Sequence, residues 1–147
     1  MVTIKQINKH LNTFADDHLQ IHSYGFGDLW EIATSGTINY PLMWVEPLGS
    51  AVRKGEVEYR FRILIMDLVQ KGEGDEIDVL SDTHRIGVDI ATEIRQGGFE
   101  GSYDWTLFGD VGMEDFTERF DEEVTGWSLT LTIKTDWSFD QCAIPTS

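Results

Sequence analysis

The chain has 147 residues, of which 41% are hydrophobic and 12% aromatic, so it is long and apolar enough for one folded domain and is no disordered acidic tail. Its formal net charge is −15, and residues 73–147 carry 18 acidic against 4 basic side chains. This excludes a nucleic-acid binder, which needs clustered Lys and Arg, and the single Cys142 excludes a disulfide framework.

A helix is predicted at the start of the chain, fading near Ser23. Five side chains recur at alternating three- and four-residue steps, as on one face of an amphipathic helix: Ile4, Ile7, Leu11, Phe14 and His18. Thr3 suits the N-cap position, and Gln6 three residues later completes a capping box.

Two strands are predicted next, at residues 26–33 and 38–46. The short polar connection between them contains Gly36, which is typical of a hairpin. Pro41 cannot donate a hydrogen bond to a neighbouring strand, so the second strand is expected at a sheet edge or with a local bulge. Residues 47–55 are predicted to form a loop.

The strongest strand of the sequence covers residues 56–69. One face is apolar throughout, with Val57, Tyr59, Phe61, Ile63 and Ile65. The other face begins with Glu58, Arg60 and Arg62 and becomes apolar from Leu64 onward. A strand with two apolar faces at its far end is expected to be central there.

A second helix is predicted from an apolar stripe between Ile77 and Ile94, ending at Gly97-Gly98. Asp75, Glu76 and Asp78 place negative charge at the positive end of its dipole. Three more strands are predicted after it, at residues 103–108, 113–120 and 127–137, with a turn at 121–126 before the last.

The predicted order is therefore α-β-β-β-α-β-β-β. Strands grouped on either side of one helix favour an α+β fold with a mainly antiparallel sheet and two helices packed on one face. Residues 1–137 are expected to form this single domain. Residues 138–147 are expected to form a C-terminal arm, which either lies on its own domain or docks on a neighbouring protein. No apolar run is long enough for a membrane helix and the N-terminus lacks a secretion signal, so we expect a soluble protein.

Histidines offer one candidate metal site. His18 and His22 have the spacing of a ligand pair on a helix, and Asp17 or Asp28 could supply a third ligand. The alternative is a helix end at which His stabilises the dipole, and we favour it because the glutamate of a metalloprotease motif is absent.

Three groups of carboxylates could bind Mg²⁺ or Ca²⁺: Asp16 and Asp17; Asp75, Glu76 and Asp78; Glu114, Asp115 and Glu118. None of these groups has the sequence of a calcium-binding loop. Solvent-exposed faces of helices and strands explain them better. Gly72 and Gly74 beside Lys71 lack the frame of a phosphate-binding loop.

Catalytic groups are also weakly indicated. Cys142 lies close to the C-terminus, and Ser81 and Ser102 lack a nucleophile motif. His84 has Asp82 and Asp89 nearby in sequence, but its place on the apolar stripe favours a core histidine. We therefore predict a protein that is not an enzyme and uses no cofactor.

Aromatic residues are numerous, with five Trp, four Tyr and eight Phe. Trp44, Trp105, Trp127 and Trp137 all fall on or beside predicted strands. A small sheet does not bury all of them, and exposed aromatic side chains are typical of protein–protein contacts.

Five segments carry a resemblance to a known family: residues 2–14, 24–31, 60–69, 123–127 and 140–145. Together they resemble the virion neck proteins of tailed phages that infect Bacteroidetes, including the crAss-like gut phages. The element order is also similar to the tail-terminator fold of long-tailed phages. The likeness spans most of the chain, although it includes no diagnostic catalytic signature.

The resemblance implies a structural subunit that forms a hexameric or dodecameric ring between portal and tail. Its expected partners are copies of itself, portal or adaptor proteins and tail proteins, with assembly in the host cytoplasm and a final place in the virion. DNA is expected to pass through the ring without specific binding, because acidic side chains repel phosphate.

Two groups of residues are expected to serve this assembly. The expected subunit-interface residues are basic: Arg53, Lys54, Arg60 and Arg62. The expected channel-facing or partner-facing residues are acidic: Glu76, Asp78, Glu114, Asp115, Glu118, Glu122 and Glu123.

Two rival functions remain open from the sequence. The first is an acidic monomeric adaptor or DNA-mimic inhibitor, which would bind a basic protein partner with steep salt dependence. The second is a small metal-dependent hydrolase, which would require His18 and His22 to converge with a carboxylate.

Overall fold

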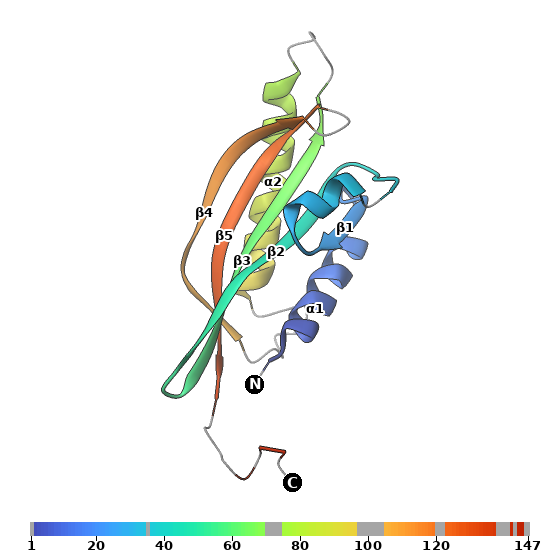
Figure 1. Cartoon of the computed structure of the whole chain (residues 1–147). Coiled ribbons are helices and arrows are strands. Elements are labelled where there is room, and N and C mark those ends of the chain that lie inside the picture. Colours follow the sequence, from blue (N-terminus) through green and yellow to red (C-terminus); the bar gives the residue numbers. More distant parts are fainter. Residues whose placement is uncertain are drawn as a thin grey trace.

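The structure is a computed structural model that describes residues 2–34, 36–69, 75–96, 105–119, 123–137, 142 and 144–145 (Figure 1). Its elements are α1 (Ile4–Asp17), β1 (Ser23–Phe26), the 3-10 helix η1 (Leu29–Thr34), β2 (Leu42–Arg53), β3 (Glu56–Leu68), α2 (Glu76–Arg95), β4 (Trp105–Arg119) and β5 (Glu123–Asp136). The predicted C-terminal arm lies mostly outside the described residues.

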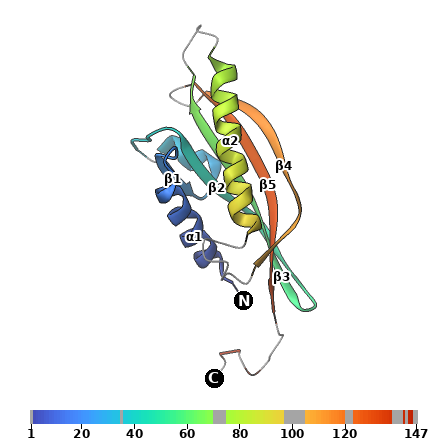
Figure 2. The same cartoon turned by 180° about the vertical axis from the view of Figure 1, so that it is seen from behind.

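One five-stranded sheet of order β1-β2-β3-β5-β4 forms the centre of the fold. Among the described strands the β1–β2 pair is parallel, and the β2–β3, β3–β5 and β5–β4 pairs are antiparallel. Figure 2 shows both helices on the same side of the sheet. The predicted α+β class, with a mainly antiparallel sheet and two helices on one face, is confirmed.

The main core lies between the helices and the sheet. Ile7 and Leu11 of α1 and Ile86 and Ile90 of α2 are buried against the apolar face of β3. A second, smaller core lies on the opposite face, where Ile32 of η1 packs with residues of β2, β3 and β5. The predicted change of β3 from one buried face to two is therefore confirmed, and β3 is the middle strand.

The first helix begins as predicted and ends earlier than predicted. The Thr3 side chain accepts a hydrogen bond from the Gln6 N–H, and the Gln6 side chain accepts one from the Thr3 N–H, which completes the capping box. The helix ends at Asp17, and His18 caps it with extended backbone. The apolar stripe stops at Phe14, so nothing beyond it holds another helical turn against the sheet.

The hairpin predicted between residues 26–33 and 38–46 is wrong. Residues 29–34 form η1, and β1 pairs with β2 in parallel, with Ser23 opposite Leu42. The connection includes η1, which crosses the sheet face and buries Ile32, and Pro41 comes before β2 rather than within it. A parallel pair needs such a crossover, whereas a short turn would have made the strands antiparallel.

The loop predicted at residues 47–55 is also wrong. β2 continues through Pro47 to Arg53, and the turn to β3 consists of Lys54 and Gly55. A bulge between Pro47 and Gly49 absorbs the proline on a stretch of β2 that β1 does not cover. Gly55 has φ of +81°, a left-handed conformation that favours glycine in this turn.

The sheet also has one strand fewer than predicted. The strands predicted at 103–108 and 113–120 are a single strand, β4, with a bulge between Phe108 and Gly112. Glycines at 109 and 112 suggested a break, but the register resumes after the bulge. β5 begins at Glu123, so part of the predicted turn belongs to that strand.

Candidate functional site

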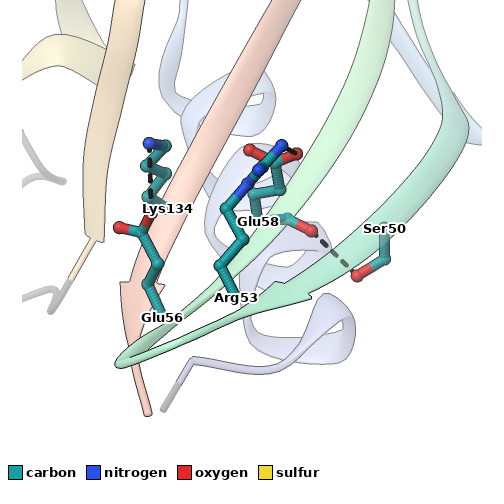
Figure 3. Close-up of polar contacts among 5 residues, drawn as sticks. All are labelled: Ser50, Arg53, Glu56, Glu58 and Lys134. Atoms are coloured by element: carbon teal, nitrogen blue, oxygen red, sulfur yellow. Dashed lines mark hydrogen bonds and ion pairs between the residues drawn. The ribbon is translucent and has the colours of Figure 1, made fainter.

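The open face of the sheet, opposite the helices, carries ion pairs between neighbouring strands. Arg53 Nη2 lies 3.2 Å from Glu58 Oε1, and Lys134 Nζ lies 3.2 Å from Glu56 Oε1 (Figure 3). Farther along the face, Arg62 Nη1 lies 3.0 Å from Glu46 Oε1. These pairs join side chains of adjacent strands, β2 with β3 and β3 with β5, and so stabilise the pairing of the strands on this face.

The predicted basic interface residues lie along the β2–β3 hairpin. Arg53 and Arg62 are already paired within the chain, although the Arg53 side chain is 60% exposed. Lys54 occupies the turn and is exposed. The Arg60 guanidinium lies over the backbone of Gly49, where a Cβ would come within 2.8 Å of Nη2.

The predicted acidic residues do not gather on one surface. Glu76 and Asp78 lie in the first turn of α2, where Glu76 Oε1 accepts a hydrogen bond from Thr117 Oγ1 of β4 at 3.1 Å. Glu114 lies on the open face of the sheet, and Asp115 lies on the helix side opposite Trp127. Glu123 begins β5. The side chain of Glu118 and all of Glu122 lie outside the described residues.

An apolar hollow of about 430 Å³ lies on the open face beside η1. Leu29, Leu64 and Phe116 line it, and the Trp30 side chain, 68% exposed, stands at its side. Phe108 of β4 is also exposed on this face, with Lys134 Nζ 3.8 Å from its ring centre. The sequence did not indicate that Trp30 is exposed beside a hollow, because Trp30 falls within a predicted strand. No period in the sequence distinguishes η1 from a short strand.

The two histidines of the candidate metal site have separate partners. His18 Nε2 lies 2.9 Å from Asp89 Oδ2 of α2, while His22 Nδ1 lies 2.8 Å from the carbonyl oxygen of Tyr40. They are not on one helix, because α1 ends at Asp17. Within the described part of the chain, no three His, Cys, Asp or Glu side chains come together as metal ligands.

The other candidate catalytic residues lie apart. The His84 ring meets Trp127 edge-on, with ring centres 4.9 Å apart, and the Trp127 indole N–H donates to the carbonyl of Leu80 at 2.8 Å. His84 is thus partly packed against the sheet, as the core interpretation predicts. Cys142 is exposed near the C-terminus.

A polar cavity lies at the end of the sheet remote from the β2–β3 turn. It has a volume of about 910 Å³ and is bounded by the end of α1, residues 21–24, residues 38–40 and the end of β3. Its lining includes Tyr24, whose hydroxyl donates to Asn8 Oδ1 at 2.8 Å and whose pKa is raised by burial. Asp67 of β3 also faces the cavity, and burial raises its pKa. No pattern in the sequence predicts this cavity, because its walls come from four separate segments.

No protein-family model matches the chain, and no curated protein matches it either. Six solved chains match its fold. One of them, whose name states no function, superposes with a TM-score of 0.51 at 9% identity, over 92% of this chain and 93% of that chain. This similarity shows the fold alone. No helix of the described residues is both long and apolar enough to cross a bilayer.

Proposed function

We propose that the chain is a structural subunit of a phage head–tail connection, a neck ring or tail-terminator protein that assembles around the DNA channel between portal and tail. The observation that carries the proposal is the open sheet, whose two edges lack partner strands among the described residues. β4 is unpaired along its outer side, and β2 is unpaired beyond Val45. Such edges are surfaces on which another protein can add a strand.

The two edges differ from each other, which suits head-to-tail assembly. The β4 edge carries Asp110, Glu114 and Asp115, whereas the far end of β2 carries Arg53 and leads into Lys54. Different surfaces that meet around a rotation axis give a ring when the rotation closes. Trp30 and Phe108 add exposed aromatic area on the open face, which is typical of interface anchors.

The charge of the chain supports a place beside DNA. With a net charge of −15 on each subunit, a ring of such subunits would repel phosphate and let DNA slide through its centre. The proposed partners are copies of the same chain, portal or adaptor proteins and tail proteins. The chain would assemble in the host cytoplasm, act in the virion and perform no catalysis.

The test is the absolute mass of the purified protein by light scattering, across protein concentration and salt. The proposal expects a discrete species of six or twelve subunits at high concentration. A protein that stays monomeric at all concentrations and instead binds a basic nucleic-acid enzyme, with affinity that falls steeply with salt, would support the DNA-mimic alternative.

A further inference from the structure

The polar cavity at the end of α1 is lined by negatively charged side chains, so it suits a cationic side chain. Among the described residues no Lys or Arg lines it, and its lining includes the carboxylates of Asp16 and Asp67. Asp67 is half-buried, and no Lys or Arg among the described residues forms an ion pair with it. The nearby ionisable groups are His22, which lowers the pKa of Asp67, and Asp82, which raises it.

The end of α1 adds to this negative potential. The C-terminal end of a helix carries partial negative charge, which basic residues usually offset. The last turn of α1 contains no basic residue, and it carries Asp16 and Asp17 instead. Two carboxylates at this end of the dipole are unfavourable unless a cation lies beside them.

A cation of suitable reach exists at the other end of the same sheet. Lys54 lies in the exposed β2–β3 turn next to Arg53, and no ion pair within the described residues holds it. In Figure 1 this turn projects beyond the body of the sheet. The turn adjoins one end of β3 and the cavity adjoins the other, at Asp67.

The two features cannot meet within one molecule. β3 has 13 residues, and a strand of that length spans about 40 Å at 3.3 Å per residue. The turn of one copy is, however, free to reach the cavity of another. At about 910 Å³ the cavity is within the size range of pockets that enclose drug-sized ligands, so it has room for a turn and its side chains.

We propose that the cavity receives the β2–β3 turn of a second copy of this chain, with the Lys54 ammonium group bound between the carboxylates of Asp16 and Asp67. The contact is head-to-tail, because turn and cavity are different surfaces. It deepens the proposed function, since it names one interface of the assembly on which that function rests.

Disulfide trapping tests the contact. In a Cys142→Ser background, one chain carries Lys54→Cys and a second carries Asp16→Cys, and the two are mixed and oxidised. The expected result is a covalent heterodimer formed at least about tenfold faster than with Asp136→Cys, a matched exposed acid on β5. Equal rates for the two acids, or no heterodimer with Asp16→Cys, would overturn the proposal.

Charge reversal gives a second, independent readout. Lys54→Asp and Asp16→Lys change exposed residues and are expected to fold, which circular dichroism checks. Each variant alone should lose head-to-tail association. In their mixture an intact turn meets an intact cavity and the two reversed charges are opposite in sign, so association should return. Association of either variant at the wild-type level would contradict the contact.

The outcomes separate this inference from the proposed function. Rings that form normally in Lys54→Asp would overturn the turn-in-cavity contact and leave the ring intact. A trapped turn–cavity pair in a protein that forms open chains rather than rings would support the contact and count against the neck ring.

Discussion

The imidazole Nε2 of His10 lies 3.1 Å from Glu93 Oε1, and this buried pair joins α1 to α2. His10 is 2% exposed, and its ring meets Trp105 of β4 edge-on, with ring centres 5.2 Å apart. One helical turn of α2 away, Asp89 contacts His18 at 2.9 Å. The two polar contacts set the helices antiparallel on the sheet and fix their register.

The His10 contact predicts a dependence of stability on pH. Burial lowers the pKa of His10 below its ordinary value of 6.5, and Glu93 opposes the change only in part. The unfolded chain therefore takes up a proton on His10 at a higher pH than the folded protein. The free energy of unfolding should keep its full contribution from His10 above pH 6.5 and should fall as the pH drops below 6.5.

Denaturant unfolding at pH 7.5 and 5.5 checks this prediction. His10→Phe should reduce the difference between the two free energies of unfolding, while Lys9→Gln, a change at an exposed neighbour on α1, should leave it unchanged. An equal difference in wild type and His10→Phe would contradict the account.

Close packing of β3 against β5 predicts a second outcome. A Cβ at Gly126 would collide with the backbone carbonyl oxygen of Ile65. Gly126→Ala should therefore lower the free energy of unfolding by roughly 2 kcal/mol or more, because the backbone itself must shift. Gly112→Ala on β4 is the matched control, since a Cβ there meets nothing within 4 Å, and thermal unfolding compares the two.

Arg60 and Arg62 look equivalent in the sequence, but they differ in the structure because Arg62 forms an ion pair on the open face. Arg62→Glu would set a carboxylate beside Glu46, whose Oε2 also accepts the Leu29 N–H at 3.1 Å, so it should cost roughly 1 kcal/mol of stability. Arg60→Glu should leave stability nearly unchanged. If both weaken assembly and only Arg62→Glu lowers the melting temperature, Arg60 belongs to the interface.

Asp67 offers a test on the stability of the free subunit. Burial is the largest cause of the raised pKa of Asp67, because the folded state disfavours the charged carboxylate. Asp67→Asn should therefore stabilise the isolated protein at pH 7, and the gain should vanish once the pH falls below the ordinary value of 3.8. A loss of stability at pH 7 would mean that the carboxylate has a structural role within the subunit.

The exposed Trp30 predicts an effect on assembly alone. Trp30→Ala should change the free energy of unfolding by less than about 0.5 kcal/mol, because the side chain is mostly exposed. It should nevertheless raise the concentration at which oligomers form, measured by light scattering. If the concentration at which oligomers form is unchanged in Trp30→Ala, the apolar hollow is not part of the subunit interface.

Long periodic segments could be predicted from the sequence. The stripe of α2, the capping box of α1 and the alternation of β3 and β5 are local signals, and each of these elements formed, although α1 ends at Asp17 and β5 begins at Glu123. The errors fell where tertiary contacts decide the outcome. Residues 29–33 were predicted as part of a strand, but residues 29–34 form η1, which buries Ile32 on the second face of the sheet.

The candidate site was less predictable than the fold. Arg53, Lys54, Arg60 and Arg62 could be named from charge alone, yet the sequence did not show that Arg53 and Arg62 pair within the chain. The cavity beside Asp67 depends on a parallel β1–β2 pair, which the hairpin prediction excluded. The chain reverses direction in irregular segments, and such segments have no hydrophobic periodicity from which their path could be predicted.

Electron microscopy of the protein, at the concentration where its mass first rises, tests the central claim most directly. Head-to-tail assembly into a neck ring predicts closed rings with one subunit number and an open centre, which Lys54→Asp disrupts. Two-fold dimers, open filaments or monomers at every concentration would contradict the ring.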